Sequence, residues 1–205
     1  MSKIEFFFDC SSPWTYLAFH GFQEIIKNNK IQVEWKPILV GGVFNSVNQD
    51  IYETRKNPNP LKFKYSRKDL KDWSALYNIT INWPDLFPLN AVNVMRGVIV
   101  ADKYNKLVPF SYSCFELYWS KGTDISNLDI LSEIAVANGI EKDIFMSEIK
   151  TQAIKDQLRT NTDNLMERGG FGSPTIFINE NDMYFGNDRL QLVKEKILGN
   201  FCYEN

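Results

Sequence analysis

The feature that most constrains this chain is the junction DCSSPWTY at residues 9–16. Before it lies a short apolar run, residues 4–8, whose three phenylalanines are typical of a buried strand. After it, apolar residues recur at helical spacing as far as Ile26. Pro13 fits the first helical position, so Ser12 lies where a strand gives way to a helix.

Ser12 allows two interpretations at this junction. A helix start offers unpaired N–H groups and the positive end of the helix dipole, so it favours an anion. A serine in that place is also a common N-cap, which satisfies only its own helix. Position alone favours the cap, and motifs at the other end of the chain raise the weight of a functional role.

The composition is that of an ordinary globular protein. The 205 residues are 44% hydrophobic and 23% charged, which is enough for one large domain or a small domain with an insertion. A net charge of −2 gives no general attraction for nucleic acid or for an anionic membrane. The sequence has no apolar run long enough to span a bilayer and no signal-peptide pattern, so we expect a cytoplasmic protein.

The cysteines and the single histidine narrow the chemistry. Cys10, Cys114 and Cys202 are an odd, widely spaced set without a Cys-x-x-Cys motif, which argues against a disulfide framework and against a metal site. Cys10 is interpreted as a buried structural residue. His20 lies two helical turns beyond Ser12, too far for a direct hydrogen bond, so a Ser-His-Asp triad is not expected.

Apolar periodicity predicts the order of the remaining elements. Residues 31–37 alternate apolar and polar positions and predict a second strand, parallel to the first. The polar stretch 44–60 is predicted to be a long loop, with room for short helical turns, that could serve function. The remaining prediction is a helical region over 69–168, a hairpin with strands over 175–178 and 183–185, and a last helix beginning after residue 186.

Five basic residues form a local cluster at the start of the helical region. They are Lys62, Lys64, Arg67, Lys68 and Lys71. The more ordinary interpretation is a solvated helix face. The more specific interpretation is that these basic side chains flank a pocket for an anionic ligand.

The predicted order, β-α-β, helical insertion, β-β-α, is that of an α/β protein with the thioredoxin topology and an all-helical insertion domain. Residues 1–44 and 168–205 would form the thioredoxin-like domain, and 45–167 the insertion. Ser12 and Thr15 stand where thiol oxidoreductases of this fold carry the cysteines of Cys-Pro-x-Cys. The segment 173–175, Ser-Pro-Thr, resembles the cis-proline motif that faces that site.

Four motifs, in order and at matching spacing, carry a resemblance that covers nearly the whole chain. They are FDxxSP at 8–13, YxxxDLxxWxxLY at 65–77, FGSPT at 171–175 and GNDRL at 186–190. With them the chain closely resembles the 2-hydroxychromene-2-carboxylate isomerases and the kappa-class glutathione transferases, which are related to DsbA.

The resemblance implies reduced glutathione as cofactor and Ser12 as the catalytic residue. The Ser12 hydroxyl would donate to the glutathione sulfur and, with the helix dipole, favour the reactive thiolate. The main chain at Ser173 would pair with the peptide part of glutathione, and Asp188 would bind its α-amino group. Asn187 and Asp188 also lie where helix capping is expected. The implied glutathione contacts are Ser12, Pro13, Trp14, Asn48, Ser173, Pro174, Phe185, Gly186, Asn187 and Asp188.

The resemblance leaves the reaction open between isomerase and transferase, because both begin with the same thiolate. It implies a homodimer and a small aromatic substrate against Phe44 and Phe87. Phe44 stands where the isomerase of naphthalene breakdown carries a basic side chain, and Phe87 where it carries a tyrosine. These departures predict weaker binding of a carboxylate-bearing aromatic substrate. Two further hypotheses remain: a thiol oxidoreductase using Cys10, and a non-catalytic binding module.

Overall fold

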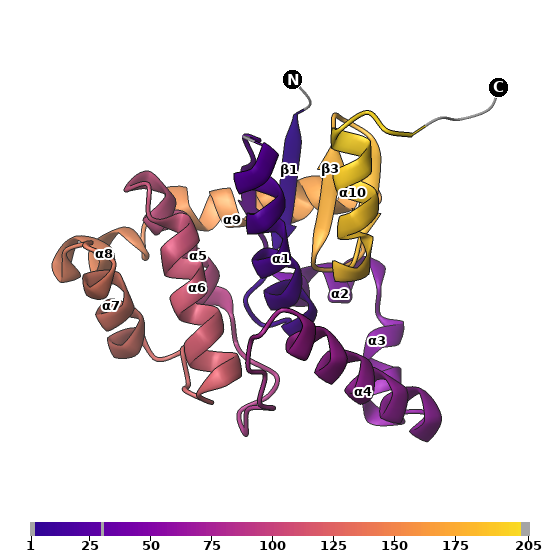
Figure 1. The fold of residues 1–205 in the computed structure, drawn as a ribbon. Coiled ribbons are helices and arrows are strands. Elements are labelled where there is room, and N and C mark those ends of the chain that lie inside the picture. The colour runs from indigo at the N-terminus through magenta and orange to yellow at the C-terminus, as the bar shows by residue number, and fades with distance from the viewer. Residues whose placement is uncertain (1–2, 30, 202–205) are drawn as a thin grey trace.

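A four-stranded mixed sheet lies at the centre of the computed structural model, which describes residues 3–29 and 31–201 (Figure 1). The strand order is β2-β1-β3-β4, with β1 parallel to β2 and antiparallel to β3, and β3 antiparallel to β4. The strands are β1 (Ile4–Phe8), β2 (Glu34–Pro37), β3 (Thr175–Ile178) and β4 (Asp182–Phe185). The predicted β-α-β start and terminal hairpin are confirmed, although the second strand begins at Glu34 rather than at residue 31.

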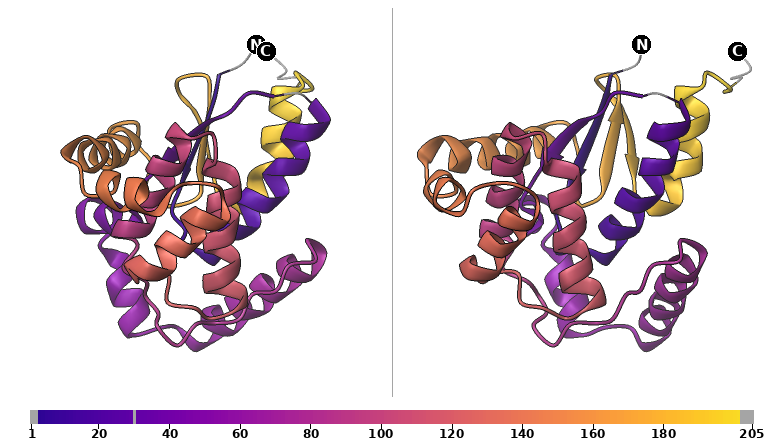
Figure 2. Two further views of the ribbon diagram at one scale, coloured as in Figure 1. Left: turned by 90° about the vertical axis from the view of Figure 1, so that its left-hand side faces the viewer. Right: turned by 60° about the vertical axis from the view of Figure 1, so that its left-hand side comes forward.

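Helices surround this sheet. α1 (Pro13–Asn29) joins the two parallel strands and lies beside α10 at the end of the chain (Figure 2). The others are α2 (Val40–Val47), α3 (Asp50–Lys56), α4 (Pro60–Leu76), α5 (Val92–Lys103), α6 (Leu107–Phe115) with a π-helical turn over Glu116–Ser120, α7 (Leu128–Ala137), α8 (Lys142–Glu148), α9 (Gln152–Glu167), and a 3₁₀ turn over Asn187–Arg189 that leads into α10 (Leu190–Ile197). No helix in the described ranges is long and apolar enough to cross a membrane.

The prediction of a long loop with short helical turns over residues 44–60 understates the helix, because most of this stretch is helical. It holds the end of α2, all of α3 and the first residue of α4. α2 accommodates two glycines, and a Cβ at Gly42 would lie 3.5 Å from the Thr162 side chain in α9. α3 has no buried residue, so no apolar period marks it in the sequence. α4 begins at Pro60, earlier than the predicted helical region, which starts at residue 69. The Asn59 side chain caps it by accepting hydrogen bonds from the backbone N–H groups of Leu61 and Lys62.

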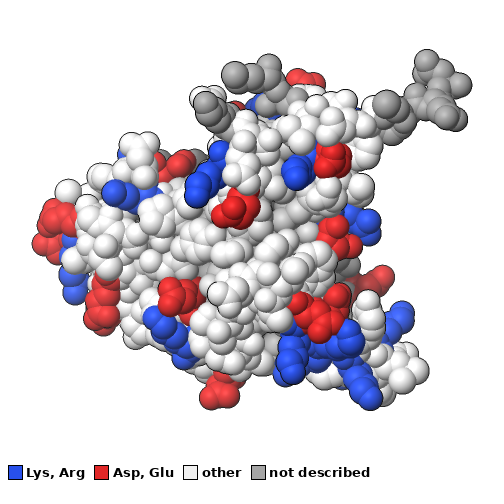
Figure 3. Space-filling view, viewed as in Figure 1, with Lys and Arg blue, Asp and Glu red and all other residues white. Residues whose placement is uncertain are grey.

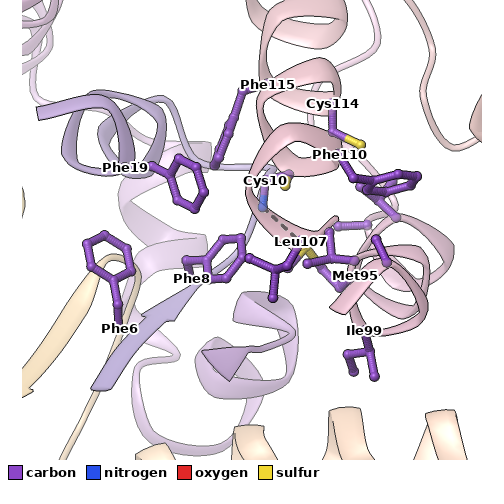
Figure 4. Close-up of a cluster of buried hydrophobic side chains, with 14 of the residues drawn as sticks. Phe6, Phe8, Cys10, Phe19, Met95, Ile99, Leu107, Phe110, Cys114 and Phe115 are labelled. Atoms are coloured by element: carbon purple, nitrogen blue, oxygen red, sulfur yellow. Dashed lines mark hydrogen bonds between the residues drawn. The ribbon is translucent and has the colours of Figure 1, made fainter. Parts of the chain in front are cut away.

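β1 is buried on both faces, which explains its unbroken apolar run. Phe6 and Phe8 lie on one face and pack against Phe19 of α1, with ring centres 6.2 and 5.2 Å away (Figure 4). Phe7 lies on the other face in a second cluster with Ile38, Val43, Leu165 and Phe177. Helices therefore cover the sheet from both sides, as is usual where parallel strands are present.

The main hydrophobic cluster draws residues from both predicted domains. It includes Phe8 from the sheet as well as Ile99 and Phe110 from α5 and α6. Leu165 lies near the end of α9, in the predicted insertion, and it packs in the cluster that contains Phe177 of β3. The division into 1–44 with 168–205 and 45–167 stays a prediction, and the α/β class is confirmed.

Truncating Phe22 tests the packing of α1 on the sheet. This side chain is fully buried, and its ring centre lies 5.3 Å from that of Phe6. Phe22→Ala should lower the free energy of unfolding in urea by about 3–5 kcal/mol, because it leaves a cavity. Val136→Ala, at a side chain of α7 that is 54% exposed, should change it by less than about 0.5 kcal/mol. Equal losses in the two variants would contradict this account of the core.

Candidate active site around Ser12

Ser12 lies immediately before α1, with its side chain partly exposed. Its Oγ accepts a hydrogen bond from the Thr15 N–H at 3.2 Å, so the capping interpretation is confirmed. The same hydroxyl donates to the carbonyl oxygen of Ser173 over a long 3.4 Å. Capping uses a lone pair of the oxygen, and within the described part of the chain the proton is held only by this weak contact. The hydroxyl can therefore cap the helix and still donate to a ligand.

Ser173 is the partner that the fold brings to Ser12 from the far end of the chain. The Ser173–Pro174 peptide bond is cis. The buried Ser173 Oγ accepts from the Asp9 N–H at 3.0 Å and shares a hydrogen bond with Thr15 Oγ1 at 2.8 Å. The Ser173 N–H donates to no other described residue. An extended peptide ligand would find both a free donor and a carbonyl at this position.

Asp9 organises the junction, a role that the sequence analysis missed. Its fully buried carboxylate accepts hydrogen bonds from the backbone N–H groups of Ser11 and Val40, both at 2.8 Å. Burial raises the pKa of the Asp9 carboxyl, and these two backbone donors oppose that shift. The available signal was an aspartate directly after a buried strand, where its side chain commonly bonds the backbone two residues on.

Gly186 and Asp188 form the next wall of the site. The Gly186 N–H donates to the Pro174 carbonyl at 3.1 Å, which ties this turn to the cis-proline. Gly186 has φ of 102°, and a Cβ there would lie 2.7 Å from Asp188 Oδ1, so glycine is required. The half-exposed Asp188 carboxylate forms an ion pair with Arg189 at 3.2 Å. Its other oxygen, Oδ1, lies over the glycine.

The expected capping by Asn187 and Asp188 is wrong. Neither the 3₁₀ turn nor α10 has a side-chain cap. Asn187 is instead 4% exposed, and its Nδ2 has no partner among the described residues. The 3₁₀ turn inserts between Gly186 and α10, and this moves both side chains off the cap position.

Asn48 and Phe185 lie around the loop that precedes the cis-proline. Asn48 is the residue directly after α2, in the C-cap position, and its Nδ2 donates to the Phe171 carbonyl at 3.1 Å. The Phe171 ring packs on Phe185 with a centre-to-centre distance of 4.6 Å. The structure thus brings these predicted residues to one side of the Ser173 loop. Trp14 is partly exposed and forms no ring pair with another described aromatic residue.

An aromatic wall includes Phe87, one of the two predicted substrate residues, whereas Phe44 forms no ring pair with another described aromatic residue. The Phe87 ring centre lies 4.7 Å from that of Trp83 and 6.2 Å from that of Trp119. Trp119 Nε1 donates to the Cys10 carbonyl at 2.9 Å, which anchors this wall beside Ser12. No local sequence pattern indicates this anchor, because Trp119 and Cys10 are 109 positions apart in the chain.

Cys10 is fully buried, as predicted (Figure 4). Its backbone N–H donates to the Met95 sulfur at 3.3 Å, and burial raises the pKa of its thiol well above the ordinary value. The reactive thiolate is therefore disfavoured at neutral pH. Cys114, also buried, has its thiol pKa raised by the same cause.

The geometry suits an anionic sulfur ligand that carries a peptide backbone. A partly exposed hydroxyl lies at the positive end of a 17-residue helix. A free N–H and a carbonyl face it from Ser173, and a carboxylate lies on the adjoining turn at Asp188. Glutathione has a matching thiol, peptide groups and ammonium group, so the residues present fit it.

Comparisons with known proteins agree with this architecture. The profile of the DSBA-like thioredoxin domain matches residues 3–198. The 2-hydroxychromene-2-carboxylate isomerase of Sphingobium xenophagum is 23% identical over 201 residues, covering 95% of this chain and 97% of that protein. Glutathione s-transferase kappa 2 of Caenorhabditis elegans is 24% identical over 208 residues, covering 94% and 90%.

One solved structure, a 2-hydroxychromene-2-carboxylate isomerase, superposes with a TM-score of 0.81 at 22% identity. The match covers 96% of this chain and 94% of that one. These comparisons confirm the predicted thioredoxin-like fold and the resemblance stated on the motifs.

Alkylation tests whether Cys10 takes part in thiol chemistry. Because its thiol is buried and protonated, iodoacetamide at neutral pH should leave Cys10 unmodified in the folded protein. The same reagent in denaturant should modify it completely, which provides the control. Peptide mass spectrometry separates this residue from the other cysteines. Rapid labelling of folded Cys10 would favour the oxidoreductase hypothesis instead.

Proposed function

Because the chain belongs to the DSBA-like thioredoxin domain family, we propose that it is a glutathione-dependent isomerase of conjugated aromatic substrates. Ser12 would activate the glutathione thiol. The alternative is a glutathione transferase of the kappa kind, which would use the same residue. Relatives named as isomerases and as kappa transferases both support an enzyme of this kind.

One observation carries the proposal, and it is the state of the Ser12 hydroxyl. Its oxygen caps α1, while its proton has, among the residues that the structure describes, only the Ser173 carbonyl at 3.4 Å as partner. A sulfur atom placed at this helix start would accept that proton in a better hydrogen bond. The helix dipole would add to the stabilisation of a thiolate. Ser12 would thus lower the pKa of a bound thiol without acting as a nucleophile.

Ser173 and Asp188 would hold the rest of the glutathione molecule. The free N–H and the carbonyl of Ser173 support pairing with its peptide backbone as a short added strand. Asp188 supports binding of the α-amino group, since its Oδ1 has no ion-pair partner among the described residues. Gly186 leaves that oxygen room that a larger residue would fill.

When bound, glutathione supplies a thiolate that adds reversibly to a conjugated double bond and so permits rotation about it. The task of Ser12 is to keep a hydroxyl proton directed at the sulfur. Phe44 and Phe87 would offer apolar surface to the aromatic part of the substrate. Product analysis separates the two reactions, since an isomer with glutathione recovered means isomerase and a lasting thioether means transferase.

We place the protein in the cytoplasm, where reduced glutathione is maintained. The described cysteines, Cys10 and Cys114, are free thiols. Reduced thiols are typical of that compartment. The proposed cofactor is present there in the form that the site would use.

Replacing Ser12 tests the central step. Ser12→Ala should lower kcat/KM with glutathione roughly 10- to 100-fold, because one charge-assisted hydrogen bond to the thiolate is lost. It should also raise the pKa of the bound thiol, which is read from the ultraviolet absorbance of the thiolate against pH. Ser147→Ala is the control, since it also removes a serine hydroxyl but one that donates to the Ile144 carbonyl within α8, away from the junction. It should leave both quantities near their original values.

Calorimetry with the unmodified protein decides the wider proposal. No binding at millimolar glutathione would overturn it. The protein could also bind glutathione while Ser12→Ala leaves the turnover of every tested electrophile unchanged. That result would favour a non-catalytic binding module.

The proposed assembly is a homodimer built through α4. This helix buries only Leu70 and Ser74 of its own residues. Leu61, Phe63 and Tyr65 on its first half are 80%, 54% and 65% exposed. Leu61 and Tyr65 are four residues apart and so lie on one face of the helix. Neighbouring exposed apolar side chains of this kind mark an interaction surface, and a second copy of the chain would cover it.

Light scattering tests this assembly. The protein should have twice the mass of its chain, and the double substitution Leu61→Lys with Tyr65→Lys should halve it, because two charges would enter an apolar interface. Ile144→Lys, at an exposed position of α8, should leave the dimer intact. A monomer at micromolar concentration in the unmodified protein would contradict the proposal.

A further inference from the structure

Arg55, at the end of α3, lies against both predicted substrate residues. Its guanidinium carbon is 5.3 Å from the centre of the Phe44 ring and 5.6 Å from the centre of the Phe87 ring. The two rings come from α2 and from the segment before α5, so tertiary packing alone brings them to one cation. Attraction between the cation and the ring faces holds the guanidinium in place.

The N–H donors of Arg55 remain available. The side chain forms no ion pair and no hydrogen bond with any described residue. Arginine carries five N–H donors in a planar fork that matches a carboxylate. Rings fix the position of the guanidinium but satisfy none of these donors in the guanidinium plane. The arrangement is therefore a preorganised cation without its anion.

Hydrogen bonds connect the Ser12 junction to the elements around the two rings. On the Phe44 side, the Asp9 carboxylate accepts from the Val40 N–H at the start of α2, the helix that carries Phe44. On the Phe87 side, Trp119, whose ring centre lies 6.2 Å from that of Phe87, donates to the Cys10 carbonyl. Asp9 and Cys10 lie just before Ser12 in the chain. The two rings that hold Arg55 thus belong to elements that are bonded to this junction.

The surroundings of Arg55 are also basic. Figure 3 shows Lys and Arg side chains gathered at the lower right of the molecule, where α4 lies. The sequence supplies Lys56 next to Arg55, and the cluster of Lys62, Lys64, Arg67, Lys68 and Lys71 on α4. In a chain of net charge −2, this local field favours the approach of an anion.

We propose that Arg55 is the specificity residue of the site and that it binds the carboxylate of an anionic aromatic co-substrate lying against Phe44 and Phe87. This inference rests on the proposed function and names its substrate class. It also reverses an expectation from the sequence, in which Phe44 in place of a basic residue predicts weak binding of such acids. In the structure, Arg55 of α3 supplies a positive charge, and its guanidinium lies over the Phe44 ring itself.

A neighbouring basic hollow provides a rival location for the anion. It has a volume of about 440 Å³ and is lined by Arg67, Lys71, Ser74 and Trp83 among others. The Arg67 guanidinium carbon lies 4.9 Å from the centre of the Trp83 ring. Arg67 therefore has the same chemistry as Arg55, which makes it the sharpest comparison in an experiment.

Ligand binding by calorimetry, with saturating glutathione and without it, tests the proposal. The probes are 1-naphthoate and its neutral isostere 1-naphthamide. The unmodified protein should bind the acid roughly tenfold or more tightly than the amide, through charge-assisted hydrogen bonds. Arg55→Gln should abolish this preference, and Arg55→Lys should restore part of it, because lysine keeps the charge without the planar fork.

Two matched variants locate the effect. Lys56→Gln removes the same charge from the same helix, and it should keep the preference. Arg67→Gln should also keep it. Retention of the preference in Arg55→Gln, its loss only in Arg67→Gln, or its absence from the unmodified protein would each overturn the assignment. Urea unfolding checks that every variant is folded.

Turnover gives a second readout. With glutathione, the ratio of kcat/KM for ethacrynic acid to that for its methyl ester should fall roughly tenfold or more in Arg55→Gln, because only the acid carries the charge. An unchanged ratio would overturn the proposal. A protein that prefers naphthoate but shows no binding of glutathione would retain this anion site and overturn the proposed function alone.

Discussion

The buried side chain and backbone of Asp9 hold together the three segments on which the site depends. Its carboxylate receives the N–H groups of Ser11 and Val40, which fixes the turn into α1 and the first residue of α2. Its own N–H donates to Ser173 Oγ, which fixes the cis-proline loop. A carboxyl shielded from water favours a protonated form, and these backbone donors act in the opposite direction. One residue thus sets the relative positions of Ser12, the start of α2 and the cis-proline loop.

Hydroxyl groups occupy the places where this fold elsewhere supports disulfide exchange. Thr15 and Ser173 share a buried hydrogen bond of 2.8 Å, and Ser12 caps the same helix turn. This network positions residues, and it carries no sulfur that could exchange electrons. Cys10, the nearest thiol in the sequence, is enclosed by the core. The backbone geometry of the redox site is kept, while hydroxyl groups take the places of its two cysteines.

The sequence predicted those features that depend on local patterns. A run of phenylalanines marked β1, Pro13 marked the start of α1, and the turn before Met183 marked the hairpin. α3 escaped prediction because none of its residues is buried, so it has no apolar period to detect. The positions of Arg55 and Trp119 escaped for a different reason. Each depends on packing between segments far apart in the chain, and no local pattern reports such contacts.

The contact between Asp9 and Ser173 joins residues 164 positions apart. Contacts between residues this far apart form only after a long stretch of chain has closed into a loop, whereas α1 can start to form from its own residues. The Ser12 hydroxyl therefore meets the Ser173 carbonyl only when these two distant segments have come together. The junction is in this way a late product of folding and not a property of the helix alone.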